Sequence, residues 1–112
     1  METLINNDLE ALIQKLPPQI ASPLVKRQDK EELLEIVLDL GREPEARFLR
    51  EDIILSSKEI SASDIQYVIE RISSFGADNR AGIERTLHRI SAIRNRSNKV
   101  VGLTLRVGRA VY

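Results

Sequence analysis

The sequence contains no cysteine and a single histidine among its 112 residues. The absence of cysteine excludes disulfide scaffolds, thiolate metal sites and cysteine nucleophiles. One histidine excludes a metal site built from several imidazoles, and we expect no metal site in this chain. No apolar run approaches the roughly 20 residues of a membrane-spanning helix, so we expect no membrane span. The first eight residues are acidic and polar, unlike a signal or transit peptide, which favours a cytoplasmic compartment.

Motifs for nucleotide or acyl chemistry are also absent. The sequence has no Gly-x4-Gly-Lys-Ser/Thr loop and no Gly-x-Gly-x-x-Gly pattern. We therefore expect that the chain alone neither binds nor hydrolyses ATP. His88 is the one base available to a serine nucleophile, and Ser91, three residues away, would lie on the opposite face of a strand. We expect no catalytic residue, and we expect His88 to be a core or surface histidine of a strand.

The charges are divided unequally along the chain. The net charge is zero, yet residues 1–79 carry −7 and residues 80–112 carry +7. The basic residues of the second segment are Arg80, Arg85, Arg89, Arg94, Arg96, Lys99, Arg106 and Arg109, opposed by Glu84 alone. Arginine suits forked contacts with phosphate or carboxylate. This asymmetry predicts an anionic partner for the basic segment, or internal pairing with the acidic segment.

The first third of the chain predicts a helical arm. Asn7 and Asp8 predict a helix N-terminus, and Pro17-Pro18 predicts its end. The apolar residues between them recur at helical spacing: Leu9, Leu12, Ile13 and Leu16. A second short helix is expected over residues 20–25.

The middle of the chain mixes strand and helix patterns. Residues 34–40 fit either, and we favour a strand because Gly41 and Pro44 follow closely. The apolar face of that strand would be Leu34, Ile36, Leu38 and Leu40. Short strands are expected over residues 46–48 and 52–56.

One helix and one hairpin are predicted in the second half. Ser61 and Asp64 predict a helix start, and Gly76 predicts its end. The helical stripe is Ile65, Val68, Ile69, Ile72 and Phe75. Residues 82–111 predict a long hairpin with its turn at residues 96–99, although residues 83–94 also fit a helix. The alternating residues of the last strand are Val101, Leu103, Leu105 and Val107.

These elements predict an α+β fold. We expect a twisted, mostly antiparallel sheet with a covering helix and a C-terminal β-hairpin, preceded by an N-terminal helical arm. We divide the chain into an arm over residues 1–30 and an α+β domain over residues 31–112.

Three stretches of sequence carry a family resemblance: residues 39–48, 78–96 and 101–111. They resemble the segment that precedes the P-loop domain in a cyanobacterial and plastid family of AAA-type ATPases. That family is related to the stage III sporulation protein AA and, more widely, to secretion and pilus-retraction ATPases. The resemblance covers roughly residues 31–112, and the arm matches loosely.

The resemblance implies a non-catalytic assembly or coupling domain of a larger, hexameric ATPase. The partners would be the protein's own ATPase domain and neighbouring subunits, with ATP and magnesium held by the P-loop domain and no cofactor in this chain. The compartment would be the cytoplasm, or the plastid stroma if the protein is plastid-encoded. The candidate phosphate-contacting residues in the full assembly are Arg89, Arg94 and Arg106, with Arg80, Arg85 and Arg109 as second choices.

Two alternatives stay open. The basic hairpin could bind single-stranded nucleic acid, but stacking needs aromatic faces, and Tyr112 is the one aromatic residue in the basic segment. Many members of the family bind single-stranded nucleic acid through an Arg-x-x-x-His module, which this sequence lacks. The arm of residues 4–25 could instead dock a protein partner through its apolar face.

Overall fold

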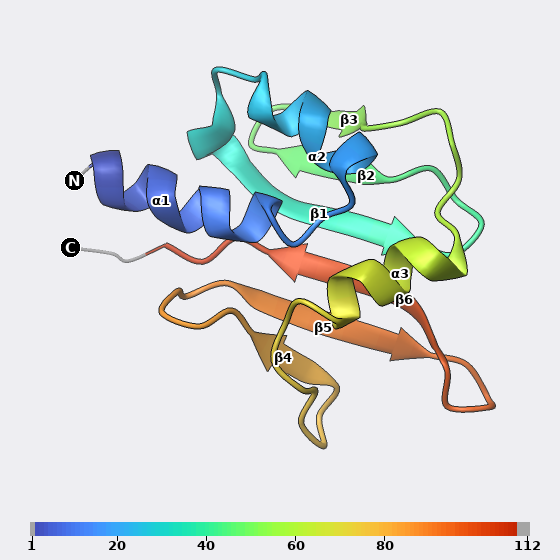
Figure 1. Ribbon diagram of the computed structural model, residues 1–112. Helices are drawn as coiled ribbons and strands as arrows, with labels where there is room; N and C mark the ends of the chain where they lie inside the picture. Colours follow the sequence, from blue (N-terminus) through green and yellow to red (C-terminus); the bar gives the residue numbers. More distant parts are fainter. Residues whose placement is uncertain (1, 110–112) are drawn as a thin grey trace.

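The computed structural model describes the backbone of residues 2–109 and the side chains of residues 8–109. In this part of the chain, three α-helices lie against one face of a six-stranded sheet with the order β3-β2-β1-β6-β5-β4 (Figure 1). All neighbouring strands are antiparallel. The predicted α+β class is therefore confirmed, with three covering helices and an added edge strand.

The elements follow one another as two helices, three strands, one helix and three strands. The helices are α1 (Glu2–Ile13), α2 (Pro18–Val25) and α3 (Ala62–Ile69), with a short 3₁₀ helix at Lys30–Glu32. The strands are β1 (Leu33–Asp39), β2 (Glu45–Phe48), β3 (Asp52–Ile54), β4 (Arg80–Gly82), β5 (Arg89–Arg94) and β6 (Val100–Arg106).

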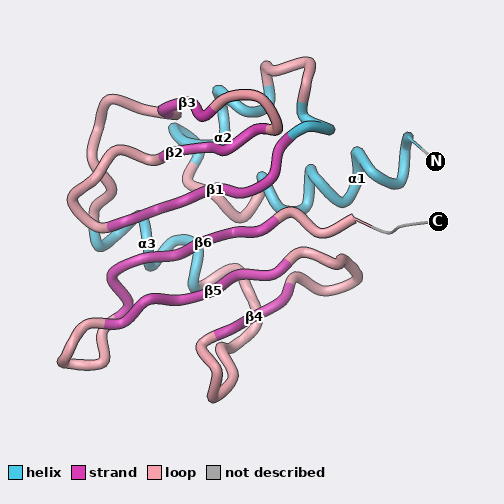
Figure 2. Tube along the Cα trace, turned by 180° about the vertical axis from the view of Figure 1, so that it is seen from behind, coloured by secondary structure: helices cyan, strands magenta, loops and turns pink. Residues whose placement is uncertain are grey.

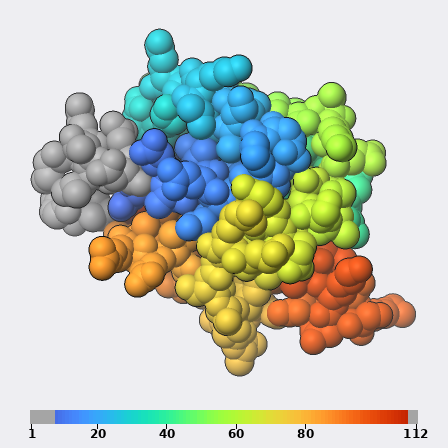
Figure 3. Space-filling view, viewed as in Figure 1, coloured from blue at the N-terminus to red at the C-terminus, as the bar shows by residue number. Residues whose placement is uncertain are grey.

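The core lies between the helices and the face of the sheet that they cover, which we call the inner face. Figure 3 shows the helical cover, with the described side chains of α1 and those of α2 in blue and α3 in green to yellow. The buried inner-face residues are Ile36, Leu38, Ala46, Phe48, Ala81, Ile90, Ala92, Leu103 and Leu105. Successive strand residues point to opposite faces, so the residues between them form a second face that no described helix covers (Figure 2).

The strand interpretation of residues 34–40 is confirmed, but two of its four inner residues were wrong. Leu33 is fully buried, whereas Leu34 is 43% exposed and Leu40 is 42% exposed. Leu40 lies beyond the end of β1 at Asp39, where the alternation of the strand no longer applies. Leu34 is exposed because of a bulge: the pairing of β1 with β2 shifts register between Leu33 and Glu35. One extra residue reverses the side on which the alternation begins.

Helix α3 begins as predicted and ends early. The Ser61 side chain accepts a hydrogen bond from the Asp64 N–H, and the Asp64 carboxylate accepts one from the Ser61 N–H. This reciprocal cap fixes the start. The helix ends at Ile69, so Gly76 is not its terminating residue; the Gly76 N–H instead donates to the Arg80 carbonyl. Ile72 and Phe75 follow the helix in irregular chain and still pack on the core.

The expected long hairpin is confirmed where residues 89–94 pair with the last strand, and it is wrong over residues 82–88, at the start of its first arm. The turn at residues 96–99 is confirmed, with Asn98 at φ +65°, and it joins β5 to β6. Residues 83–88 form a loop, and residues 80–82 pair on the outer edge of β5 as β4. The alternation of apolar and polar residues is weak before residue 89 because the chain turns back at residues 83–86. The last strand, β6, ends at Arg106 and is shorter than expected, while residues 110–112 lie outside the described residues.

The helical arm packs on the same core. Helix α1 starts at Glu2, so the cap predicted at Asn7 and Asp8 is wrong: both residues lie inside the helix. Its predicted stripe is confirmed as buried: Leu9, Leu12, Ile13 and Leu16 are each at most 4% exposed. The second helix is also confirmed and keeps Pro23 inside it, with Ile20 and Leu24 buried and Val25 exposed.

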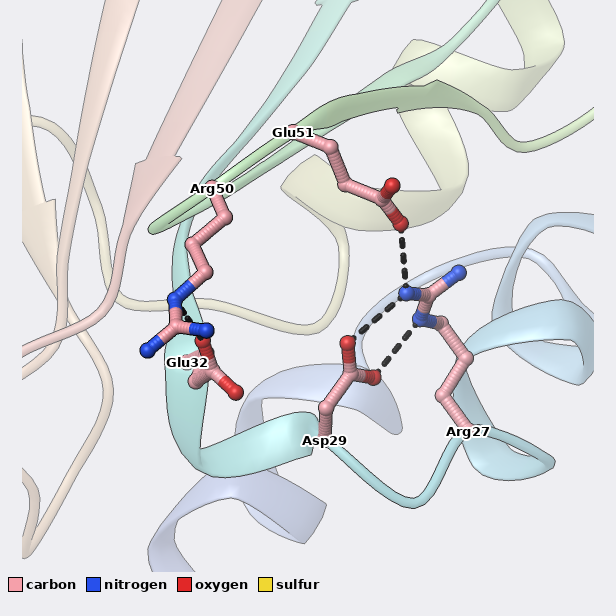
Figure 4. Close-up of polar contacts among 5 residues, drawn as sticks. All are labelled: Arg27, Asp29, Glu32, Arg50 and Glu51. Carbon is pink, nitrogen blue, oxygen red and sulfur yellow. Dashed lines mark hydrogen bonds and ion pairs between the residues drawn. The ribbon is translucent and has the colours of Figure 1, made fainter.

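An arginine cluster ties the arm to the sheet (Figure 4). Arg27 Nε and Nη2 donate to the two carboxylate oxygens of Asp29, each at 2.8 Å. Arg27 Nη2 also donates to Glu51 Oε1 at 2.9 Å, in the connection between β2 and β3. The Arg27 guanidinium carbon lies 4.4 Å from the centroid of the Phe48 ring. Glu32 and Arg50 form a second, looser ion pair at 3.9 Å.

Deleting residues 1–28 should abolish cooperative unfolding. The deletion removes six buried apolar side chains: Leu9, Leu12, Ile13, Leu16, Ile20 and Leu24. Each contributes about 1.5–3 kcal/mol on burial, and together they match the whole stability of a small domain, about 5–15 kcal/mol. Thermal unfolding followed by circular dichroism tests this, and an unchanged melting temperature would show that the arm lies outside the core.

The Arg27–Asp29 pair should make stability acid-sensitive. Hydrogen bonds from Arg27 lower the pKa of the Asp29 carboxyl in the folded state. The pair therefore stabilises the fold above the unfolded-state pKa of about 4, and this contribution is lost as pH falls through the folded-state value. The drop in melting temperature between about pH 7 and pH 3 should shrink in Asp29→Asn. Asp52→Asn, an exposed aspartate on β3, is the control; an equal drop in Asp29→Asn and wild type would contradict the assignment.

Candidate functional site

The uncovered face of the sheet holds most of the strand charges, and we call it the open face. Its strand residues are Asp52 and Ile54 on β3, Glu45 and Arg47 on β2, Glu35, Val37 and Asp39 on β1, Gly102, Thr104 and Arg106 on β6, Arg89, Ser91 and Ile93 on β5, and Arg80 and Gly82 on β4. The antiparallel register aligns them in rows across the strands. Charged residues distant in the sequence thereby become neighbours.

Two of the three first-choice arginines are cross-strand partners. Arg89 on β5 stands directly opposite Arg106 on β6, and both are exposed. Within residues 8–109, no carboxylate lies within 4.0 Å of the Arg89 guanidinium. Like charges directly opposite on a sheet are destabilising. The pair is therefore suited to an anion that lies between the two side chains.

Glu35 lies beside this pair and had no place among the predicted site residues. It stands opposite Arg106 on one side and opposite Arg47 on the other. Arg47 Nη1 donates to Glu35 Oε2 at 2.9 Å, whereas Arg106 Nη2 lies 4.0 Å from Glu35 Oε1. Arg106 is thus held loosely, and its side chain is 74% exposed. The alternation of Glu35, Val37 and Asp39 along the strand was the pattern that could have indicated this residue.

Arg94 and Arg109 make contacts within the fold and do not join this pair. Arg94 Nε donates to Asn79 Oδ1 at 2.7 Å, and Arg94 Nη1 donates to the Asn98 carbonyl at 2.9 Å. Arg94 thereby holds the turn between β5 and β6. Arg109 Nη2 donates to two backbone carbonyls, those of Glu31 at 2.6 Å and Leu33 at 2.9 Å. Burial lowers the pKa of Arg109.

The two remaining candidates lie at the margin of the open face. Arg80 is exposed on the edge strand β4, opposite Ser91. Arg85 is exposed in the loop before β5 and adopts φ +65°, which is uncommon for a residue with a side chain. Arg80 extends the basic surface of Arg89 and Arg106 by one strand.

His88 is a structural residue, as expected, although it lies just before β5 and not within the strand. It is 3% exposed, and its Nε2 lies 2.7 Å from the Asp8 carbonyl of α1. The Gly108 N–H donates to His88 Nδ1 at 3.0 Å. Nδ1 therefore accepts and Nε2–H donates, so the neutral ring joins the arm to the chain after β6. Ser91 lies on the open face, away from the buried ring.

The described aromatic side chains lie elsewhere. Phe48 is buried on the inner face beneath Arg27, and Phe75 packs on the core. Tyr67 is on α3, where the Arg71 guanidinium carbon lies 3.3 Å from its ring centroid. Tyr112 is outside the described residues. Within residues 8–109 the open face therefore has no aromatic platform on which bases could stack.

Among the described residues, no group of three histidine, aspartate or glutamate side chains is placed to hold a metal ion. None of the described helices is both long and apolar enough to cross a membrane. The chemistry that the arrangement offers is thus electrostatic contact through paired guanidinium groups.

Replacing Gly108 by alanine should destabilise the fold by about 3 kcal/mol. A Cβ on Gly108 would collide with the backbone carbonyl of Leu87, which cannot move aside as a side chain can. The collision would also displace the Gly108 N–H from His88. Gly82→Ala is the matched control because its Cβ would meet nothing within 4 Å. Urea unfolding measures both variants, and equal stabilities would contradict this close approach.

The chain is similar in sequence to segments of longer proteins. No protein-family model matches it. It is 50% identical over 109 residues to the uncharacterised protein ycf45 of Porphyra purpurea. It is 48% identical over 104 residues to SEEDLING PLASTID DEVELOPMENT 1 of Arabidopsis thaliana. These matches cover 97% and 93% of the chain, but 19% and 15% of the two relatives. The chain therefore spans less than a fifth of the length of these relatives.

A solved structure shares the fold. The ATPase DotB of Legionella pneumophila superposes with a TM-score of 0.51 and 11% sequence identity. The match covers 82% of this chain and 29% of DotB. At this identity the likeness concerns the fold alone. The chain is thus homologous to one segment of ycf45 and SEEDLING PLASTID DEVELOPMENT 1, and it has a fold that also occurs within an ATPase.

Proposed function

We propose that this chain is a non-catalytic coupling domain of an oligomeric P-loop ATPase, in which Arg89 and Arg106 contact nucleotide phosphates at a subunit boundary. The observation that carries the proposal is the exposed, directly opposed arginine pair on the open face. The fold shared with part of the ATPase DotB supports it. ATP and magnesium would be held by another part of the longer protein, since this sequence has no phosphate-binding loop.

The guanidinium groups of Arg89 and Arg106 make few ion pairs within the fold. Arg89 has no ion pair within residues 8–109, and Arg106 is 4.0 Å from its one carboxylate partner, Glu35. A phosphate placed between them would relieve the repulsion of the pair and would cost little internal bonding. A guanidinium directed at a transferring phosphoryl group offsets the charge that develops there.

The contacts of the other candidates divide them into two groups. Arg94 and Arg109 hold the turn and the end of β6, so their loss would act through stability. Arg80 is exposed on the same face as the pair and is proposed as an additional phosphate contact. Arg85 is exposed in the loop before β5, and we propose it as a contact with a neighbouring subunit.

The proposed setting is the plastid or a cyanobacterial cytoplasm. The relative from Arabidopsis thaliana is named for seedling plastid development. The parent assembly is proposed to be a ring, hexameric as in the secretion ATPases that the sequence resembles.

ATP hydrolysis by the full-length protein tests the phosphate role. Arg89→Ala and Arg106→Ala should each lower the turnover number by about tenfold or more, in the manner of an arginine finger. Arg96→Ala is the matched control, because it removes the same charge from the exposed turn of the same hairpin. Unchanged rates in Arg89→Ala and Arg106→Ala would contradict the proposal, as would an equal loss in Arg96→Ala.

The two alternatives have less support. Binding of single-stranded nucleic acid would rest on arginine–phosphate contacts alone, given the absence of aromatic side chains among the described open-face residues. Protein docking through the apolar face of the arm is opposed by the burial of that face in the core.

A further inference from the structure

Charge divides the open face along the boundary between β1 and β6. The half formed by β1, β2 and β3 carries four carboxylates and one arginine: Glu35, Asp39, Glu45, Asp52 and Arg47. The half formed by β4, β5 and β6 carries three arginines and, among its strand residues, no carboxylate: Arg80, Arg89 and Arg106. A partner with charge of a single sign would be repelled by one of the two halves.

Large apolar side chains are exposed on the same face. Ile54 on β3 is 54% exposed, and Ile93 on β5 is 52% exposed. At one end of the face, Leu34 in the β1 bulge is 43% exposed, and Leu87, two residues before Arg89, is 60% exposed. Apolar side chains mixed with charges of both signs are typical of a protein–protein interface.

We propose that the open face binds the open face of a second copy of this chain, across a two-fold axis that runs parallel to the strands between β1 and β6. Such an axis exchanges the two halves, so the acidic half of each copy lies over the basic half of the other. A two-fold axis in the plane of the face but perpendicular to the strands would oppose like halves. The charge pattern therefore selects one arrangement of the two copies.

The area of the open face determines how strongly two copies are expected to associate. The six strands contain 30 residues in all. At about 3.3 Å per residue and about 4.8 Å between strands, they present roughly 480 Å² per copy. The total of roughly 1,000 Å² is below the roughly 1,200–2,000 Å² of stable interfaces and in the range of transient ones. The self-association should therefore be weak, dependent on concentration and weakened by salt.

This contact goes beyond the phosphate role proposed above and does not rest on it. It needs neither nucleotide nor the rest of the longer protein, so it is measured on the 112-residue chain alone. If both roles hold, they exclude each other at any one moment, because the second copy covers Arg89 and Arg106.

Sedimentation velocity of paired charge-reversal variants tests the contact. One variant carries Glu45→Lys and Asp52→Lys, and the other carries Arg80→Glu and Arg89→Glu. Wild-type chain should sediment as a monomer–dimer mixture at low salt. Each variant alone should associate at least about tenfold more weakly, because like charges then meet across the axis. An equimolar mixture should restore association to about the wild-type level, since opposite charges meet again in the heterodimer.

The control variant carries Glu10→Lys and Glu70→Lys, which make the same charge change at exposed positions on the helical side. It should associate as the wild type does. Circular dichroism establishes that all three variants are folded. Wild-type chain that stays monomeric at about millimolar concentration and low salt would overturn the proposal. So would a mixture that fails to associate, or a control that loses association as the open-face variants do.

Discussion

The pairing of β1 with β6 is the contact on which the rest of the molecule depends. It joins residues 33–39 to residues 100–106 at the centre of the sheet and links the two three-stranded halves. It also sets Glu35 opposite Arg106 and thereby brings the acidic and basic parts of the sequence onto one surface. Because the partners are so far apart in the chain, this pairing carries a large loop-closure cost, which burial of the inner face must offset.

Only the inner face of the sheet is buried by the described helices, which leaves the open face accessible for contacts. The helices supply apolar cover to the inner face, so the strands fold without needing apolar residues on the other side. The arm belongs to that cover and is held by two separate contacts. Arg27 joins it to the connection between β2 and β3, and His88 joins α1 to the chain after β6.

The two proposed contacts of the open face share the same arginines, Arg89 and Arg106. Arg89 and Arg106 repel each other unless an anion or a partner's carboxylates lie against them. Phosphate needs this pair alone, whereas a second copy needs the whole divided face.

By itself the sequence determined the elements that local physics governs. The Ser61–Asp64 cap, the turn at residues 96–99 and the helical stripe from Leu9 to Leu16 were predicted because each depends on residues close in the chain. The asymmetry of charge along the chain was also evident from the sequence. Tertiary structure alone decided the bulge that exposes Leu34, the early end of α3 and the edge strand β4. It also separated Arg89 and Arg106, which share the open face, from Arg94, which bonds to Asn79 and Asn98. These features depend on register and on contacts between distant residues, and such contacts leave no periodic pattern in the sequence.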